Sequence, residues 1–322
     1  MCGCMPVHLA IMQGHTDAVR CLLAHSPERQ LVHYSDAGLS AMLYAADEAN
    51  VAVMRLLLIM SCTDNPEQLV QQAGNTRMTP LLLAARRCSA ASMQLLLQYS
   101  PNKQVQQVDE EGCNSLMYAL ATEKEGEGLK LVRLLLRHSP EVQVQQISHL
   151  GSSALICAMR RNHLEIIREL LQHCPAKQVT AGRSFKDSPL CLAVEVARVD
   201  FVQVMASHMT DPAVLALGFM GATAVASQFF AAATSVAFAK AQLHCCQLLL
   251  AAGADPTTLT PQQLSTFGRA LPEVQKLVQE ACRRRRKGQR PAQVGNASDM
   301  LSMASCTSVL VSCVPWIICI PV

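Results

Sequence analysis

The chain has 322 residues, of which half are hydrophobic, 16% are charged and only 4% are aromatic. This length suits two average domains or one elongated repeat array. The low aromatic share argues against an all-β fold, which favours aromatic and β-branched side chains. The net charge of +3 is small for this length, so we expect no nucleic-acid partner, because nucleic-acid binding is typical of strongly basic surfaces.

The fifteen cysteines are scattered, with no CxxC pair and no Cys/His cluster at zinc spacing. Cys21, Cys157 and Cys191 lie among apolar residues at helical spacing, where free Cys behaves as a small hydrophobe. The pattern is typical of a reducing, intracellular compartment. We expect a cytoplasmic protein, and the nucleus and a membrane surface stay open as alternatives. No basic stretch followed by an apolar run begins the sequence, so no signal peptide is predicted.

A first block of small and apolar residues recurs along the chain, and each copy closes with Ala. The closing residues lie 35, 39, 35, 39 and 35 positions apart. They are Ala10, Ala45, Ala84, Ala119, Ala158 and Ala193. Ser or Thr opens the block directly before Pro in two copies, Thr79-Pro80 and Ser188-Pro189. We predict a short helix in each copy, because the hydroxyl caps free backbone N–H groups and Pro at the first helical position loses no hydrogen bond.

A second block, rich in consecutive Leu, follows each first block, and its wide apolar stripe predicts a second helix. Its copies begin at Val19, Met54, Met93, Val132 and Ile167. A third block links the units at Pro27, Pro66, Pro101, Pro140 and Pro175. Because Pro cannot continue the preceding helix, we interpret the third block as part of a connecting loop. One helix pair cannot bury its own apolar face, so the copies must stack.

These blocks resemble the ankyrin repeat family. The family pattern TPLHLAA–GH–VRLLL is visible in Pro6–Ala10, Gly14–His15 and Val19–Leu23, and again in Thr79–Ala85. The stretch Leu248–Pro256 resembles the end of a family repeat, so the resemblance covers about residues 5–256. It implies an all-α solenoid of about seven helix-pair repeats. The periods exceed the usual ~33 residues and most copies lack the family's His and Gly-His, so we expect longer loops and irregular hairpin fingers.

The sequence divides into four parts: a repeat array at 1–260, C-terminal capping helices at 261–282, a basic linker at 283–299 and an uncharged apolar tail at 300–322. The array starts almost at Met1, so the first repeat is either a truncated cap or the start of a fragment. Residues 212–239 carry no charge. We interpret them as a pair of Ala-rich packed helices and not as a membrane span, because Cys245–Pro256 resumes the repeat in frame.

The end of the chain leaves alternatives open. The run Arg283–Lys287, with Arg290, fits an unstructured solvated tail, a nuclear-import address or a patch for acidic lipid headgroups. Behind it, Met300–Val322 is uncharged, which fits a tail anchor. Against an anchor, the segment contains several Ser residues and Pro315, which breaks helices. A disordered or loosely docked tail and a membrane-associated tail both remain.

No arrangement for catalysis is apparent: the sequence has no P-loop, no dinucleotide fingerprint, no H-E-x-x-H and no G-x-S-x-G elbow. The resemblance implies a structural role for His8 and His15. The other histidines of note, His25, His138 and His173, end second helices, where a cation suits the helix C-terminus. We therefore expect no enzyme, no cofactor and no metal site.

The resemblance implies that partners bind the concave groove, which is built from the hairpin fingers and the exposed side of each first helix. Carried over by position, the partner-binding candidates are Asp47, Glu48, Arg86, Arg87, Glu110, Glu111, His149, Arg160, Arg161 and Phe185. Their charges alternate in sign between repeats. This pattern predicts either a solvated face whose repeats neutralise one another or a groove that reads a peptide of mixed charge, with Arg pairs holding carboxylates. Phe185, an aromatic at a fingertip, is the expected hot spot.

We therefore expect a monomeric, non-catalytic scaffold or adaptor that recognises a partner protein through the groove. A membrane-tethered ankyrin-like protein, anchored through Met300–Val322, is one alternative. A substrate-recruiting subunit of a ubiquitin ligase is the other.

Overall fold

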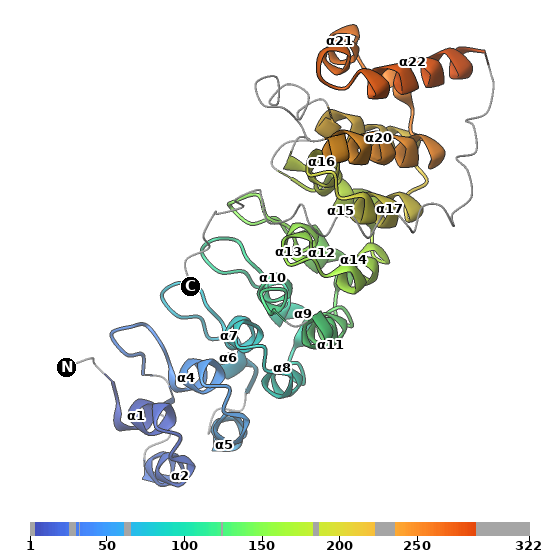
Figure 1. Ribbon diagram of the computed structural model, residues 1–322. Coiled ribbons are helices and arrows are strands. Elements are labelled where there is room, and N and C mark those ends of the chain that lie inside the picture. Colours follow the sequence, from blue (N-terminus) through green and yellow to red (C-terminus); the bar gives the residue numbers. More distant parts are fainter. Residues whose placement is uncertain are drawn as a thin grey trace. The chain divides into compact units, whose positions relative to one another are not determined.

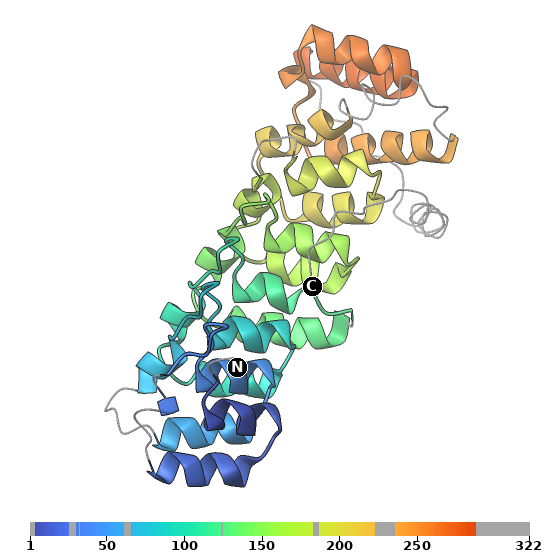
Figure 2. The same cartoon turned by 90° about the vertical axis from the view of Figure 1, so that its left-hand side faces the viewer.

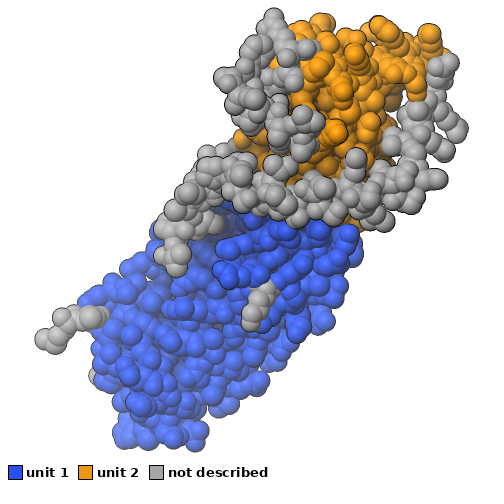
Figure 3. All heavy atoms as spheres, in the orientation of Figure 1, with its two compact units in different colours: residues 1–181 blue, residues 182–322 orange. Residues whose placement is uncertain are grey.

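The computed structural model describes residues 4–25, 30–31, 33–60, 66–123, 125–182, 187–222 and 236–287. Over these ranges the chain is helical, and β structure is limited to the isolated bridges Val108–Asn114 and Ile147–Ser153. The chain divides into two compact units, residues 1–181 (unit 1) and residues 182–322 (unit 2), coloured in Figure 3. The array predicted at 1–260 therefore extends over both units.

Unit 1 is built from pairs of a first and a second helix, as Figures 1 and 2 show. The first helices are α1 (Pro6–Met12), α4 (Ala41–Asp47), α7 (Pro80–Arg86), α10 (Ser115–Ala119) and α13 (Ala154–Arg160). The second helices are α2 (Thr16–His25), α5 (Val51–Met60), α8 (Ala90–Leu96), α11 (Glu125–Leu135) and α14 (Leu164–Leu171). Each first helix packs on the next first helix and each second helix on the next second helix, so unit 1 is two parallel rows of stacked helices.

The first helices begin where their capping residues place them. The side chains of Thr79, Asn114 and Ser153 accept hydrogen bonds from backbone amides three residues later, at 3.4, 3.0 and 3.3 Å. Each bond satisfies one of the amides that a helix N-terminus leaves without a partner. Ser40 differs, because its hydroxyl donates to Gln72 Oε1 at 2.7 Å and so links α4 to the loop that follows α6.

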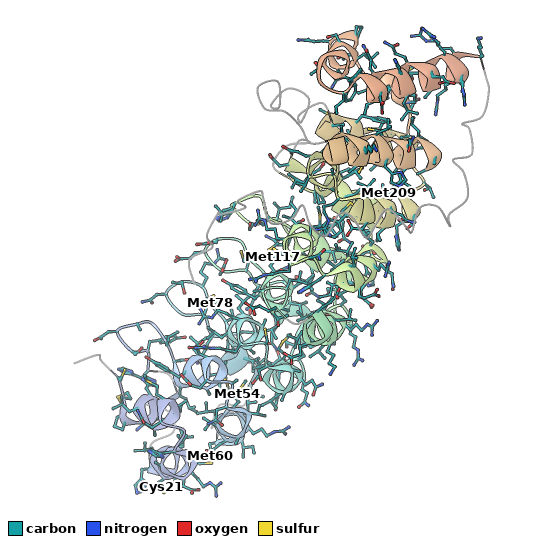
Figure 4. All side chains as sticks on the ribbon, in the orientation of Figure 1. Cys21, Met54, Met60, Met78, Met117 and Met209 are labelled. Carbon is teal, nitrogen blue, oxygen red and sulfur yellow. The ribbon has the colours of Figure 1, made fainter. Side chains whose placement is uncertain are left out.

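The core of unit 1 repeats in register with the sequence. Ala45, Ala84, Ala119 and Ala158 are fully buried, which lets neighbouring first helices approach closely. On the second helices, Leu57, Leu96, Leu135 and Leu170 are fully buried. Among the residues labelled in Figure 4, Met54 on α5 and Met117 on α10 are also buried. Since each buried Leu stabilises the fold by about 1.5–3 kcal/mol, these repeating side chains supply much of the driving force for stacking.

A short third helix follows each of several second helices. These are α6 (Pro66–Val70), α9 (Pro101–Gln104), α12 (Pro140–Gln145) and α15 (Pro175–Thr180), and each starts at the Pro of the third sequence block. The interpretation of that block as a loop is therefore wrong at these places. Pro ends the second helix, but its fixed φ also preorganises the first position of a new helix.

One buried Gln ties each of three third helices to the second helix before it. Gln104, Gln143 and Gln178 are at most 1% exposed. The Nε2 of Gln143 donates to the carbonyl oxygens of Leu135 at 2.8 Å and His138 at 2.5 Å. Gln104 and Gln178 bond the equivalent carbonyls of their own repeats. Each side chain thus donates to two carbonyl groups at the end of a second helix, the first of which also accepts from the amide three residues later.

Unit 2 continues the pattern with α16 (Pro189–Glu195) and α17 (Val199–Ser207), followed by the short α18 (Pro212–Ala216) and the longer α20 (Val236–Ala251). α20 packs against α16 and α17, and Gln242 Nε2 donates to the carbonyl of Glu195 at 3.2 Å. The segment 212–239 thus contains α18 and the start of α20, while residues 223–235 lie outside the described residues. Among the described residues, no helix has the length and apolar character needed to cross a membrane.

A turn of 3-10 helix (Pro256–Thr258) leads into two final helices, α21 (Pro261–Ala270) and α22 (Pro272–Arg286). α22 packs on α20 and α21, and it buries Val274 and Val278. The basic linker predicted from residue 283 is wrong at its start, because Arg283–Arg286 form the last turn of α22. Arg is a good helix former, and its charge favours a helix C-terminus, so the basic run extends the helix. Residues 288–322, including the tail at Met300–Val322, lie outside the described residues.

The Gln contacts generate a stability prediction. We expect Gln143→Leu to lower the free energy of unfolding by about 2 kcal/mol, because the carbonyl of His138 loses its donor and the carbonyl of Leu135 loses one of its two donors, keeping only the amide of His138. Gln106→Leu, on an exposed side chain, is the matched control and should change it by less than about 0.5 kcal/mol. Urea denaturation of the full chain measures both, and equal stability of the two variants would contradict the assigned role.

Candidate functional site

The candidate surface combines two sets of exposed positions in unit 1, which we call the finger face. The first set is the turns, or fingers, that precede α4, α7, α10 and α13. The second set is the last residue of each first helix and the residue after it. Because both sets recur once per repeat, the stack places them in rows.

The fingers share one backbone geometry. Their turns occupy residues 35–38, 74–77, 109–112 and 148–151. In each, the first residue's amide bonds a carbonyl four residues on, and the fourth residue's amide bonds back to the first residue's carbonyl. The fourth residue has a positive φ, of 71°, 56°, 77° and 79° in turn, and it is Gly in all but Arg77. The expectation of irregular fingers is therefore wrong, since backbone bonds and a left-handed residue fix the turn without the family's His.

Neighbouring fingers are bonded to one another. The amide of Glu110 donates to the carbonyl of Thr76 at 3.3 Å, and the amide of His149 donates to the carbonyl of Glu111 at 2.7 Å. Gln146 Nε2 donates to the carbonyl of Gly112 at 3.1 Å. The side chains of Glu110, Glu111 and His149 are exposed at these tips. The fingers therefore hold these three predicted residues on one connected edge.

Inside its finger, Asp109 organises the turn. One oxygen of its carboxylate accepts from the amides of Glu111 at 2.9 Å and Cys113 at 2.8 Å, and the other accepts from the hydroxyl of Tyr118. Burial, and then the bond to Asp109, raise the pKa of Tyr118 well above its ordinary value. Burial is also the main cause that raises the pKa of the Cys113 thiol to about 12. Neither group is poised to react near neutral pH, so this buried cluster is structural.

The helix ends of repeats two and three form an ion-pair cluster. Arg86 Nη2 donates to Asp47 Oδ1 at 2.8 Å, and Arg87 donates to both carboxylate oxygens, at 3.1 and 3.0 Å. Burial raises the pKa of Asp47, but the hydrogen bonds and charges of Arg87 and Arg86 outweigh it, so the pKa lies below its ordinary value. Of the two interpretations, mutual neutralisation of neighbouring repeats fits this part of the surface. Glu48 is exposed, and its charge acts on Arg87.

The helix end of repeat five is different. Arg160 and Arg161 are both exposed, and Arg160 Nη1 donates to Ser152 Oγ at 3.1 Å. Neither Arg forms an ion pair with any residue that the structure describes. The hydrogen bond holds Arg160 against its own finger and leaves its charge uncompensated. Leu150, at the tip of that finger, is 61% exposed, and sequence reasoning did not single it out.

The structure thus places nine of the predicted partner-binding residues on the finger face. Asp47, Arg86 and Arg87 are joined in one cluster, Glu110, Glu111 and His149 share the finger edge, and Arg160 and Arg161 stand together. Phe185 lies outside the described residues. No group of three or more metal-ligating side chains occurs in the part of the chain that the structure describes.

The finger geometry can be tested at two matched positions. Gly112 has φ 77°, and a Cβ there would lie 3.3 Å from His149 Cδ2, so Gly112→Ala should lower the free energy of unfolding by about 1–2 kcal/mol. Arg77 occupies the equivalent place with φ 56°, so Arg77→Gly should raise it by up to about 1 kcal/mol. Denaturation curves check both signs, and a shift in the same direction for the two variants would contradict the shared geometry.

The ion-pair cluster predicts a pH dependence. Because the pKa of Asp47 is lowered by folding, its contribution is present above the unfolded value of about 3.9 and is lost as pH falls through the lower folded value. The two Arg side chains are about half exposed, so we expect less than about 1 kcal/mol. The difference in unfolding free energy between the natural chain and Asp47→Asn, measured from pH 7 to pH 2, should therefore vanish in acid. A difference that persists at pH 2 would show another role for Asp47.

Comparison with known proteins accords with this geometry. The family model for ankyrin repeats matches residues 2–66 and 120–215, half of the chain, as three copies. The crystal structure of the ankyrin repeat domain of Bcl-3, described as a unique member of the IkappaB protein family, shares 23% identity and a TM-score of 0.54, covering 66% of this chain and 89% of that one. An ankyrin repeat protein, EF0377, shares 17% identity and a TM-score of 0.47, covering 54% of this chain and 82% of that one.

No curated protein matches the chain. Ankyrin repeats generally mediate protein–protein interaction, and they are generally not catalytic. On its repeats, its stacked helix pairs and this family match, the chain belongs to the ankyrin repeat family.

Proposed function

We propose that this chain is a non-catalytic scaffold or adaptor that holds a partner protein on the finger face of unit 1. The observation that carries the proposal is the uneven distribution of free charge over that face. Asp47 is saturated by Arg86 and Arg87, whereas Arg160 and Arg161 carry two exposed charges without an ion pair among the described residues. A bound partner supplies the missing anion.

The partner chemistry follows from these charges. A carboxylate on the partner would meet the Arg160–Arg161 pair, since guanidinium groups bind carboxylates with charge-assisted and often bidentate hydrogen bonds. The neighbouring finger edge offers Glu110 and Glu111 to a partner cation, since both are exposed and form no ion pair in the described part of the chain. The exposed Leu150 supplies an apolar contact beside them. We infer a segment of mixed charge, with an acidic group placed over α13.

The contacts of the two Arg pairs decide which pair is the better target for charge reversal. Reversing Arg86 and Arg87 would break their bonds to Asp47 and disturb the packing of α4 on α7, so a loss of binding there would have two causes. Reversing Arg161 together with Arg160 removes only one bond, to Ser152. Arg160 and Arg161 are therefore the sharper probe of the finger face.

The experiment is affinity purification with quantitative mass spectrometry from cells, followed by titration of the recovered partner. The variants are Arg160→Glu with Arg161→Glu, and Glu110→Lys with Glu111→Lys. The matched control reverses Arg20 and Arg55, which are exposed on the second helices α2 and α5. We expect at least tenfold weaker binding by the first variant and full binding by the control, because charge-assisted bonds contribute about 1.5–3 kcal/mol each.

A partner that binds the Arg160/Arg161 variant as tightly as the natural chain would remove the finger face of repeat five from the proposal. Equal loss in that variant and in the Arg20/Arg55 control would point to net charge and not to a site. If the purified chain catalysed turnover of a small-molecule substrate, the proposal that it is non-catalytic would be contradicted.

A further inference from the structure

The last turn of α22 and the capping residue after it carry five consecutive basic residues, Arg283–Lys287. The helix is 15 residues long and is the final helix in Figure 1. Its apolar side is already used, because Val274 and Val278 are buried where α22 packs on α20 and α21. The orientation of the basic turn is therefore fixed by the packing of the helix and not by the basic residues themselves.

Two of the five basic side chains are committed to partners. Arg284 pairs with Glu280, one turn back on the same helix. Arg285 Nη2 lies 3.2 Å from Asp255 Oδ2. Burial raises the pKa of Asp255, but its bonds to Thr257 and the charge of Arg285 outweigh this, so the pKa lies below its ordinary value. The Asp255 carboxylate therefore favours its ionised form, and Glu280 and Asp255 each hold one arginine in an ion pair.

The remaining three basic side chains share one face. Arg283, Arg286 and Lys287 are exposed, and they form no ion pair with any residue in the described ranges. They lie at positions i, i+3 and i+4, which neighbour one another on a helix surface. The exposed Lys276 lies two turns earlier on the same side, and Glu280, which lies between Lys276 and Arg283, is paired with Arg284. We call these four residues the cationic stripe.

The stripe favours a ligand with many negative charges on a flat surface. Four cations spaced over about three turns match a plane of phosphates better than a single carboxylate. The net charge of +3 for the whole chain is low for a nucleic-acid binder. A nuclear-import address needs the whole basic run, but here Arg284 and Arg285 are held in ion pairs.

The sequence that follows the stripe favours a lipid bilayer over a nucleic acid as the anionic ligand. Between Lys287 and Val322 only Arg290 and Asp299 are charged, and the chain ends in an apolar segment that contains Trp316. A bilayer offers anionic headgroups to the stripe and an apolar phase to that segment, with Trp suited to the interface. A nucleic acid offers only the phosphates. We propose that the cationic stripe of α22 binds the anionic headgroups of a lipid bilayer and brings this end of the chain to a membrane surface.

The test uses the full chain in vesicle co-sedimentation. The vesicles are phosphatidylcholine alone, and phosphatidylcholine with about one third phosphatidylserine. The informative variant is Arg283→Gln with Arg286→Gln. Its matched control is Arg284→Gln with Arg285→Gln, which removes the same charge from the same turn but at ion-paired positions.

We expect the natural chain to bind the phosphatidylserine vesicles and to be released by high salt, because the attraction is screened. The Arg283/Arg286 variant should partition about 25-fold more weakly, at about fivefold per cation near an anionic surface. The Arg284/Arg285 control should lose less than about fivefold, because its cations already face carboxylates.

Equal losses in the two variants would overturn the stripe, because the vesicles would then sense the net charge of the run. Equal binding of the natural chain to neutral and anionic vesicles would also overturn it, since the apolar end alone would explain attachment. Binding to a short nucleic-acid duplex in preference to the phosphatidylserine vesicles would assign the stripe to a different ligand. Of the four altered residues only Arg284 is half-buried, and circular dichroism checks that each variant remains folded.

Discussion

The fold depends on burial between repeats. A first helix of five to seven residues and a second helix of at most eleven are too short to be stable alone, since isolated helices of this length are marginal in water. Each pair gains stability only by placing residues such as Leu96 and Leu135 against the pairs on either side. The buried Ala at the same place in each first helix sets how closely the neighbours approach. The turns and helix ends of the finger face are spaced by this stack, so their positions depend on the packing of the core below them.

Stacking alone leaves the helix ends unsatisfied, and the third helices solve that problem. A second helix that ends inside the unit exposes carbonyl groups that would be costly to bury without donors. Gln104, Gln143 and Gln178 each bring two amide hydrogens to those carbonyls from a helix that starts at Pro. The residue before that Pro adopts a left-handed φ of 42° to 48°. The extra residues in each period thus form a short helix that caps the end of the second helix, and they are not an irregular loop.

Much of this fold was open to prediction from the sequence, because repetition averages out local ambiguity. The Ala spacing and caps such as Ser153 predict the first helices, and the consecutive Leu residues predict the second. The third helices were missed because four to six residues carry no periodic signal and Pro was taken only as a stop. The register also puts Asp47, Arg86 and Arg87 at equivalent helix ends, and the structure brings the three side chains into contact. It could not show which charges pair, because that depends on side-chain distances between residues 39 and 40 positions apart.

The same distinction between committed and free charge carries the functional argument in each unit. Arginines close together in sequence look equivalent. Yet, within the described residues, Arg87 pairs with Asp47 while Arg161 forms no ion pair, and Arg285 pairs with Asp255 while Arg286 forms no ion pair. A committed cation contributes modestly to stability and offers little to a ligand, because binding would first have to break its ion pair. A free cation on a rigid helix loses little order on binding and keeps its full attraction. In this chain, a binding surface is therefore better located from the basic side chains that form no ion pair among the described residues than from a run of basic residues in the sequence.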